Sequence, residues 1–413
     1  MPTRAAARTA TSGQDATTAG RRGNAARMNT WRQRLRVPRE WFIPPLVWVD
    51  DPTTGGFTAL SRNRSEAQWQ ALVDTDGPIV TQVDDGRTPP GGIGTQPSSS
   101  CSQPSLLLAM LDALDLHSAH RTLEIGTGTG WNAALLAART GPRGHVTSLD
   151  VDPAIADQAR ITLRRAGFPP HSPHVVHTDG ACGHPPDQPY DRIIATASTT
   201  SIPRTWIDQM HPGGVLVAPW GTDYSNGALL RMTVQPDGTA RGRFGPHLAF
   251  MQLRNERPQH LQPHTPELHA AARSSTNRTA REIHEMTTFS RAAFTIGLLV
   301  PDCYLTAEQP DHRHHVIELH DTRSRSWARV DLVDDPRNPT VSQLGPRRLW
   351  NEVDTAYAWW LDTGRPSPTD YELTITPDGT HFVDLRTPDG GLRWPLAPFS
   401  RERRGEIPHS GQW

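Results

Sequence analysis

One glycine-rich turn, Gly126-Thr-Gly-Thr-Gly130, constrains the fold of this chain more than any other stretch of its sequence. It follows the strand pattern of residues 121–125 and precedes a helix pattern that begins at Trp131. Glycine adopts positive φ angles without strain and lets the backbone approach a ligand, because it has no Cβ atom. A strand, a glycine turn and a helix in this order indicate a ligand site at the carboxyl edge of a parallel sheet.

Strand and helix patterns alternate through the middle of the chain. Apolar strand patterns follow the glycine turn at residues 144–150, 174–180, 190–197 and 215–219. Regular alternation of this kind predicts a doubly wound, Rossmann-like parallel sheet of the α/β class. A further pair of strands, at 229–234 and 242–244, is expected to join the sheet edge as an antiparallel hairpin.

The composition of the chain predicts five segments. A length of 413 residues exceeds that of one ordinary domain, so more than one folding unit is expected. A start rich in Ala, Arg and Thr indicates a disordered tail, and a later polar stretch rich in His, Pro and Arg indicates a linker. The expected segments are a tail at 1–27, an N-terminal segment with a substrate loop at 28–100, the main α/β domain at 101–257, the linker at 258–280 and a C-terminal α+β module at 281–413.

The flanking segments carry patterns of their own. In the N-terminal segment we expect a helix at 65–73, a strand at 78–83 and then a long loop, rich in Gly and Pro, at 84–100. A loop of this length often serves as a lid or a binding segment. In the C-terminal module we expect strands at 316–320 and 327–333, an amphipathic helix at 346–361, and a hairpin at 371–375 and 381–385.

The charge and cysteine content argue against several classes of protein. With 42 basic and 43 acidic residues the net charge is −1, so nucleic acid is not expected as a partner. Cys101, Cys182 and Cys303 are too few for a disulfide framework, and neither they nor the histidines show metal-site spacing, so no metal is expected. Free cysteines suit a reducing compartment, and no apolar run approaches the ~18 residues of a membrane span. We therefore expect a cytoplasmic protein with no membrane partner, and take it to be a monomer.

Three acidic residues lie where successive strands of the expected sheet end. Glu124 comes just before the glycine turn, Asp150 ends the next strand and Asp179 the one after it. Asp150 follows the turn at about the distance at which an acid reaches a nucleotide ribose. An acid at position 124 repels a pyrophosphate but attracts a sulfonium amino acid, and Trp131 replaces the last glycine of the dinucleotide pattern. The pattern therefore favours S-adenosyl-L-methionine over NAD.

A serine-rich segment precedes the helix pattern at 106–114. Ser102 has two interpretations, as the N-cap of this helix or as a neutral group that orients a substrate carboxylate. A carboxylate is already ionised at neutral pH, so its attack on a sulfonium methyl requires positioning and desolvation rather than a strong base. The flanking residues expected to contact the substrate are Ser99, Ser100, Cys101 and Gln103.

Five motifs occur in the order of one known family. They are Ser102-Gln-Pro104, Leu123-Glu-Ile-Gly-Thr-Gly-Thr-Gly-Trp-Asn-Ala-Ala134, Asp179-Gly180, Tyr190-Asp-Arg-Ile-Ile194 and Pro212-Gly-Gly214. Together, over residues 78–256, they resemble protein-L-isoaspartate O-methyltransferase, an S-adenosyl-L-methionine-dependent enzyme with a class I methyltransferase sheet. The resemblance implies that Ser102 is the active-site serine, beside the substrate carboxylate.

The same resemblance implies how the cofactor is held. Glu124 and the glycines would hold its methionine part, Asp150 its ribose, and Asp179 its adenine amino group. The cofactor-binding residues expected on this basis are Glu124, Gly126, Thr127, Gly128, Gly130, Asp150, Val151, Asp179 and Gly180.

The chain differs from the simple repair enzyme of this family, which is much shorter. It adds a segment around Trp41, an expanded loop before Ser102, and the module after residue 280. This layout resembles the homologues that modify ribosomal peptides, either graspetides or lanthipeptides. It implies O-methylation of an aspartate in a macrocyclised precursor peptide, and the ester then closes to an aspartimide that persists or opens to isoaspartate.

Two other functions stay open on the sequence alone. A general isoaspartyl repair enzyme would turn over an isoaspartyl test peptide well. A non-catalytic peptide-binding protein on a methyltransferase fold would bind no cofactor. The module at 281–413 is expected to recognise the substrate.

Overall fold

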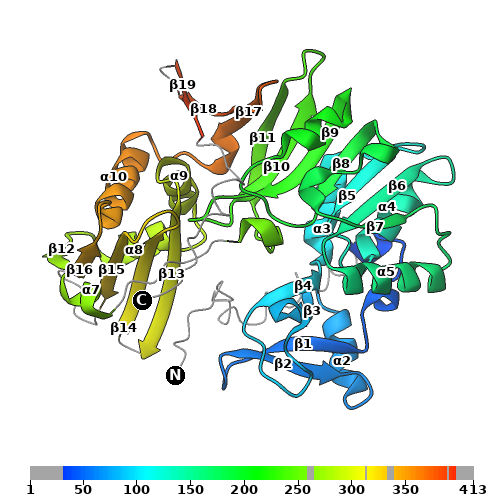
Figure 1. The fold of residues 1–413 in the computed structure, drawn as a ribbon, viewed down its shortest axis with the longest axis horizontal. Coiled ribbons are helices and arrows are strands. Elements are labelled where there is room, and N and C mark those ends of the chain that lie inside the picture. The colour runs from blue at the N-terminus through cyan, green and yellow to red at the C-terminus, as the bar shows by residue number, and fades with distance from the viewer. Residues whose placement is uncertain (1–30, 258–264, 312–313, 333–338, 388–389, 397–413) are drawn as a thin grey trace, which may run out of the picture.

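The computed structural model describes residues 31–257, 265–311, 314–332, 339–387 and 390–396 (Figure 1). The described strands form three sheets, of ten, four and five strands. The expected N-terminal tail lies outside the described residues. Among the residues that are described, no helix combines the length and the apolar character needed to cross a bilayer.

Five parallel strands form one half of the ten-stranded sheet. In chain order they are β5 (Arg121–Ile125), β6 (His145–Asp150), β7 (His174–His177), β8 (Tyr190–Ala195) and β9 (Met210–Trp220). Their spatial order is β7-β6-β5-β8-β9, so the chain reverses its direction of winding between β5 and β8. Ile125 at the end of β5 lies opposite Ala195 at the end of β8. The predicted doubly wound sheet is confirmed, and this reversal is where such sheets bind ligands.

Helices cover both faces of these strands. One face packs against α3 (Pro104–Leu114), α4 (Trp131–Thr140) and α5 (Pro153–Arg165), and the other against α6 (Arg204–Asp208) and α9 (Arg291–Leu299). In α3, Leu107, Met110, Leu111 and Leu114 are buried, at the three- and four-residue spacing that places side chains on one side of a helix. Burial of these side chains fixes α3, and with it the serine segment that comes just before it, against the sheet.

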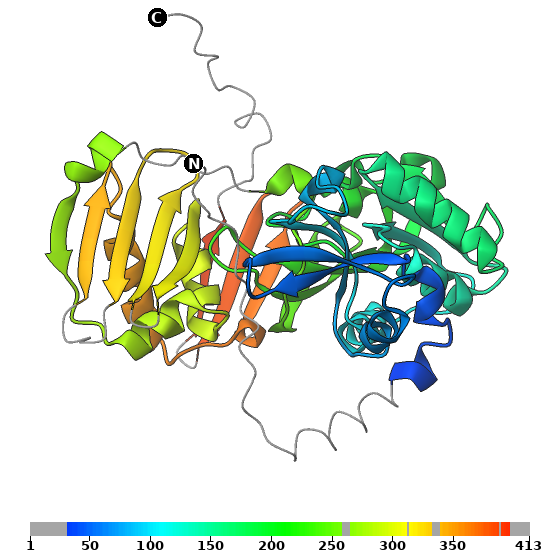
Figure 2. The same ribbon diagram turned by 90° about the horizontal axis from the view of Figure 1, so that it is seen from below.

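Five antiparallel strands complete the same sheet. They are β10 (Ala228–Val234), β11 (Ala240–His247), β17 (Tyr371–Ile375), β18 (His381–Thr387) and β19 (Gly390–Pro395). β11 pairs with β17, with Gly242 opposite Leu373. The hairpin expected at the sheet edge therefore lies inside the sheet, and the module expected as a separate unit at 281–413 gives its last strands to the main domain. Figure 2 shows β17, β18 and β19, orange to red, between the yellow strands and the green ones.

The five-stranded sheet is built by the chain between β11 and β17. Its spatial order is β12 (Ala272–Ser275), β16 (Thr340–Leu344), β15 (Trp327–Leu332), β14 (His314–Asp321) and β13 (Cys303–Asp311). The helices α8 (Ala280–Thr287), α9 and α10 (Leu349–Asp362) share one core with it, and Trp350, Tyr357 and Trp360 of α10 are buried there as expected. The segment expected as a linker is partly ordered, because α7 (Thr265–His269) and β12 lie within it and β12 pairs with β16.

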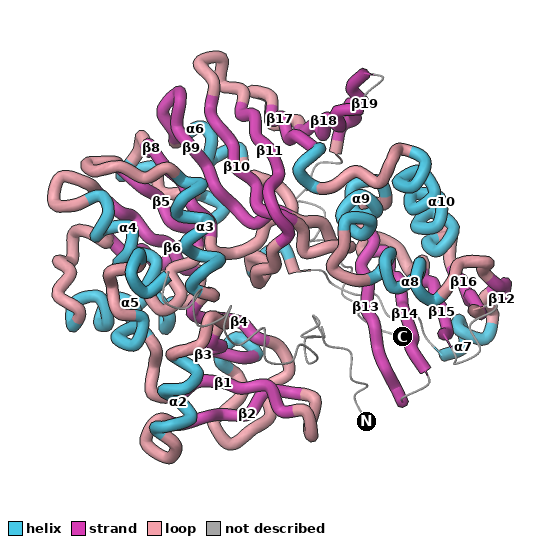
Figure 3. The backbone as a smooth tube through the Cα atoms, turned by 180° about the vertical axis from the view of Figure 1, so that it is seen from behind, coloured by secondary structure: helices cyan, strands magenta, loops and turns pink. Residues whose placement is uncertain are grey.

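The N-terminal segment forms the four-stranded sheet. Its spatial order is β2 (Gly56–Ser61), β1 (Leu46–Asp51), β3 (Ile79–Val83) and β4 (Pro97–Cys101), with α2 (Glu66–Val73) beside it (Figure 3). A short 3₁₀ helix, Arg39–Phe42, precedes β1. The long loop expected at 84–100 is shorter in the structure, because its end is β4. Three serines in a row give no apolar alternation, so β4 is specified by its pairing with β3 rather than by pattern.

We expect the ten-stranded sheet to unfold as one unit, because Leu373 of β17 is fully buried in the same core as Leu123 of β5. Leu373→Ala should lower the free energy of unfolding by about 2–4 kcal/mol, the usual loss for a truncated core leucine. Calorimetry should show the transition of the parallel strands moving with it. Leu392→Ala is the matched control, since Leu392 of β19 is 43% exposed, and should leave the transition in place. Two transitions, only one of which shifts in Leu373→Ala, would contradict a shared core.

Candidate active site at the carboxyl edge of the parallel strands

A cavity of about 480 Å³ opens where the winding of the sheet reverses. The ends of β5, β6 and β8 form its floor, and the segment from Pro97 to Leu107 forms one wall. Residues 249–255 and Tyr304 close other sides. All three sheets therefore contribute to this cavity, and it lies at the edge where the sequence placed the ligand site.

The glycine turn needs all three of its glycines. Gly126, Gly128 and Gly130 have φ angles of +93°, +52° and +85°, which side-chain-bearing residues seldom adopt. A Cβ atom on Gly126 would lie 3.1 Å from Thr196 Oγ1, and one on Gly128 would lie 3.4 Å from the main-chain oxygen of Ser100. The turn is therefore a backbone surface that leaves space over the cavity floor.

Glu124 does not line the cavity, contrary to the expectation of direct ligand contact. It is 0% exposed, because the side chains of β5 alternate and this one points toward α4. Its Oε1 accepts a hydrogen bond from Asn132 Nδ2 at 2.8 Å, and its Oε2 accepts one from the Ser148 hydroxyl. Burial raises the pKa of Glu124 to about 8, although both hydrogen bonds act to lower it.

Asn132 connects Glu124 to the cavity and was missed in the sequence. It lies in the first turn of α4 and lines the cavity. Its Nδ2 is bound to Glu124, and its Oδ1 is buried without a hydrogen-bond partner among the described residues. A buried acceptor of this kind is costly unless a donor reaches it, so Oδ1 marks a place for a donor group.

Asp150 and its neighbour form the next part of the floor. Asp150 Oδ2 accepts a hydrogen bond from Gly128 N at 3.0 Å, and its Oδ1 accepts one from Asp152 N. Burial raises the pKa of this carboxyl, and the two N–H groups oppose the change. Val151 also lines the cavity and is 37% exposed. Thr127 lines it as well, but its hydroxyl is hydrogen-bonded to Ser148.

Asp179 and Gly180 lie together on the cavity wall at the end of the strand that follows. Asp179 accepts hydrogen bonds from Ala181 N at Oδ1 and from Asn255 Nδ2 at Oδ2. A Cβ atom on Gly180 would lie 2.5 Å from Cγ2 of Ile125, so only glycine fits here. The predicted pair is therefore held in place by packing on one side and by residue 255 on the other.

The serine segment lines the cavity along its length, from Ser98 to Gln103. The residue that caps α3 is Gln103, without a side-chain cap, so the interpretation of Ser102 as the helix cap is wrong. The Ser102 hydroxyl makes no hydrogen bond with the described residues. By contrast, Ser99 accepts a hydrogen bond from Thr81, and Gln103 donates one to Ser105. Ser102 thus offers an uncommitted hydroxyl at the cavity.

Cys101 does not present its thiol to the cavity as expected. The side chain is buried, and its sulfur lies 3.4 Å from Nε of Arg39, which donates to it. The main-chain oxygen of Cys101 accepts a second hydrogen bond from the same guanidinium. Alternation along β4 turns this side chain toward the core, so the thiol is unavailable to a substrate.

Arg39 is a buried residue that the sequence did not single out. It is 3% exposed and donates hydrogen bonds to the main-chain oxygens of Thr75, Gly77, Cys101 and Ser102. Its guanidinium also lies 5.6 Å from the ring centre of Trp131, a cation–π distance. Arg39 therefore fixes the backbone at Ser102 relative to the start of α4.

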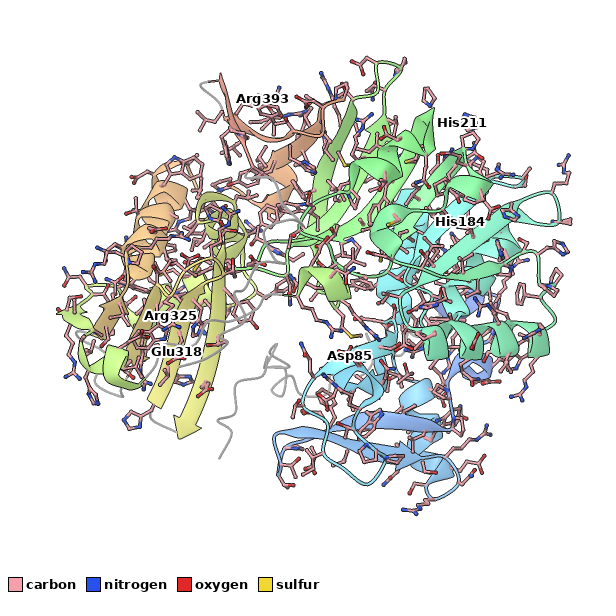
Figure 4. The ribbon with its side chains drawn as sticks, viewed as in Figure 1. Asp85, His184, His211, Glu318, Arg325 and Arg393 are labelled. Carbon is pink, nitrogen blue, oxygen red and sulfur yellow. The ribbon has the colours of Figure 1, made fainter. Side chains whose placement is uncertain are left out.

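A second polar network spans the cavity from the four-stranded sheet to β6. Arg254 donates to Gln82 Oε1 at 3.0 Å and to Asp152 Oδ2 at 2.9 Å. Its Nε lies 3.2 Å from Asp85, which Figure 4 labels. Arg257 also pairs with Asp85, at 2.9 Å. The segment around residue 254 contains a short 3₁₀ helix, Arg254–Glu256, and one isolated bridge. Its side chains tie the two sheets together at the cavity.

Comparison with known proteins identifies the family. The model of the protein-L-isoaspartate(D-aspartate) O-methyltransferase family matches residues 88–257. The protein-L-isoaspartate O-methyltransferase of Ignicoccus hospitalis is 30% identical over 222 residues, which is 54% of this chain and 87% of the relative. Those of Methanopyrus kandleri and Pyrococcus horikoshii are 36% and 37% identical, over 54% and 38% of this chain and 81% and 69% of their own lengths.

The region that the family model matches contains the cavity floor and the serine segment. Enzymes of this family are carboxyl methyltransferases that depend on S-adenosyl-L-methionine, which agrees with a site built from a glycine turn and strand-end acids rather than from a pyrophosphate cradle. This chain belongs to the protein-L-isoaspartate O-methyltransferase family and is an S-adenosyl-L-methionine-dependent carboxyl methyltransferase.

Proposed function

We propose that this enzyme methylates an aspartate side-chain carboxylate in a ribosomally made, macrocyclised precursor peptide of the graspetide or lanthipeptide kind. The ester then closes to an aspartimide by attack of the next backbone nitrogen, with loss of methanol, and the aspartimide persists or opens to isoaspartate. One observation supports this proposed substrate. Tyr304, from the five-stranded sheet outside the matched region, lines the same cavity as Ser102.

The residues of the cavity floor fit the cofactor. The open backbone of the glycine turn leaves space that a Cβ atom at Gly126 or Gly128 would occupy. The unpartnered Oδ1 of Asn132 suits an ammonium donor, such as the one on the cofactor's amino acid part. Asp150 is assigned to the ribose and Asp179 to the adenine amino group. We therefore assign Glu124 an indirect role, in which it holds the Asn132 amide with Oδ1 toward the cavity.

When bound, S-adenosyl-L-methionine supplies a methyl group on a positively charged sulfur. The chain's own task is to bring a carboxylate oxygen in line with that methyl and to remove water around it. The hydroxyl of Ser102, uncommitted among the described residues, donates to one carboxylate oxygen and leaves the other as the nucleophile. A neutral donor suits this role, because an ion pair would reduce the nucleophilicity of the oxygen. Arg39 serves as a positioning residue, since it holds the main-chain oxygen of Ser102.

The substrate wall of the cavity is neutral and partly aromatic. Ser100, Ser102 and Gln103 offer polar groups without charge, and Phe250 and Tyr304 offer ring surfaces. Arg254 lines the cavity too, but it is paired with Asp85 and Asp152. A wall of this kind suits a peptide in which the reacting carboxylate is the only charged group that faces it. We assign the five-stranded sheet with α8 and α10 to recognition of the rest of the peptide.

General isoaspartyl repair is the second candidate function. It is favoured by the relatives, all of which carry the name protein-L-isoaspartate O-methyltransferase. A repair enzyme must admit many unrelated peptides to its cavity, whereas an enzyme dedicated to one peptide requires a cavity wall that is specific for that peptide. Family membership favours both of these functions over non-catalytic peptide binding.

We expect Ser102→Ala and Asp150→Ala to separate turnover from cofactor binding. Ser102→Ala should lower kcat by about 10²-fold, a typical loss for a positioned donor, with little change in the affinity for S-adenosyl-L-homocysteine. Asp150→Ala should instead weaken that affinity by on the order of tenfold or more, because it removes a hydrogen-bond acceptor from the floor. Calorimetry and single-turnover kinetics measure the two quantities. An equal loss of affinity in both variants would contradict the assigned roles.

We expect cofactor binding to release a proton from Glu124. Its folded pKa of about 8 keeps much of this carboxyl protonated at neutral pH. A bound cation favours the carboxylate and lowers that pKa, so affinity should rise with pH until about 8 and then level off. Titration calorimetry in two buffers of different ionisation enthalpy measures the proton released. The variant Glu124→Gln controls for protons from the ligand's own amino group, and identical proton release in both proteins would overturn the linkage.

The substrate assignment is tested with two peptides and one variant. The enzyme should add a methyl group to a cyclised precursor peptide encoded beside its gene, followed by loss of methanol in the mass spectrum. An isoaspartyl test peptide should be a poor substrate. Tyr304→Ala should raise KM for the precursor by on the order of tenfold without changing cofactor affinity. Phe289→Ala, an exposed aromatic in the same module, should not. Rapid turnover of the isoaspartyl peptide alone would instead establish the repair function.

A further inference from the structure

A cluster of three histidines and one aspartate lies at the opposite edge of the parallel strands. His145 is the first residue of β6 and His174 the first residue of β7. His184 and Asp187 come from the connection between β7 and β8 (Figure 4 labels His184). Because β6 ends at Asp150, the cluster is a full strand length away from the methyl-transfer cavity.

All three imidazoles point one nitrogen at the same carboxylate oxygen, Oδ2 of Asp187. The distances are 3.4 Å from His145 Nε2, 3.2 Å from His174 Nδ1 and 3.5 Å from His184 Nε2. Ligands bound tetrahedrally at about 2.0–2.1 Å from a zinc ion lie about 3.3–3.4 Å apart. The atoms offered by His145, His174 and Asp187 also lie within 4.8 Å of one another. The three distances from the imidazoles therefore match the three tetrahedron edges that meet at Oδ2 of Asp187.

Hydrogen bonding explains the same distances less well. An N–H···O hydrogen bond is normally 2.7–3.2 Å long, and the distances from His145 and His184 exceed this range. Oδ2 already accepts a hydrogen bond from the Thr147 hydroxyl at 2.7 Å, so four groups converge on one oxygen. Nε2 of His145 is buried and has no hydrogen-bond partner of good geometry among the described residues. An ion between these groups would satisfy them together.

We propose that His145, His174 and Asp187 bind a divalent transition-metal ion, Zn²⁺ foremost, with His184 as the fourth ligand. Imidazole with carboxylate is a donor set that zinc accepts, and four protein ligands fill a tetrahedral shell. The Thr147 hydroxyl donates to Oδ2 and orients the carboxylate from outside, and the Arg121 guanidinium holds the main chain of the same residue by donating to the main-chain oxygen of Asp187. The Arg121 charge opposes a cation, so ligation by the imidazoles must supply the affinity.

The role assigned to this site is structural. A filled shell leaves no open position for a substrate. The ion would tie the starts of β6 and β7 to the connection that begins with Asp179 and Gly180 on the cavity wall. Metal binding should therefore raise the unfolding temperature rather than change the chemistry of methyl transfer.

The test uses the untagged full chain, stripped with a chelator and then titrated with Co²⁺ and Zn²⁺. About one equivalent should bind, with the visible absorption of tetrahedral Co²⁺, and the ion should be released as the pH falls below that at which histidine protonates, about 6.5. Zinc should also raise the unfolding temperature. His174→Ala and Asp187→Asn should abolish these effects.

The substitutions His171→Ala and His177→Ala are the controls, because both side chains are exposed and neither belongs to the cluster. His171 precedes β7, and His177 ends it, opposite Asp150. They should bind the metal as the unchanged protein does. Circular dichroism and S-adenosyl-L-homocysteine affinity verify the fold of each variant, and His145→Gln replaces any variant that does not fold. Binding that persists in His174→Ala and Asp187→Asn, or an unchanged protein that takes up no stoichiometric metal, would overturn the proposal.

Discussion

The architecture of the active site depends on one buried guanidinium. Arg39 has no carboxylate partner among the described residues and instead holds four main-chain oxygens, from the turn before β3 and from the end of β4. A hydrogen bond from a charged donor contributes about 1.5–3 kcal/mol, and an oxygen left buried without a donor costs a comparable amount. Trp131, whose ring lies beside the guanidinium, donates its own Nε1–H to the main-chain oxygen of Val37. The N-terminal sheet, the serine segment and α4 are thus connected through two neighbouring side chains.

The two edges of the parallel strands have different chemistry. At the carboxyl edge, backbone groups and acids surround a cavity large enough for a nucleotide-like ligand. At the amino edge, imidazoles converge on one carboxylate. The connection between β7 and β8 joins the two edges, since it begins with Asp179 and ends near Asp187.

The sequence predicted the parallel strands well, because periodicity reports local burial. The glycine turn, Asp150 and Asp179 were found in the same way, since each lies at the end of a clear strand pattern. Residues fixed by contacts between distant segments gave no such signal. Arg39, Asn132 and Tyr304 reach the site through packing of elements far apart in the chain, and His145, His174 and Asp187 have no ligand spacing along it. Glu124 was recognised, but its direction depends on which face of β5 meets α4.

The pairing of β11 with β17 has a consequence for synthesis of the protein. About 120 residues separate the two strands, so β11 is made long before its partner. At about 5–20 residues per second, its edge stays unpaired for roughly 6–25 seconds on the ribosome. An exposed strand edge is a template for association with other chains. During that interval the exposed edge of β11 in the nascent chain should need shielding from other chains. A shorter family member that lacks the inserted sheet would not have this need.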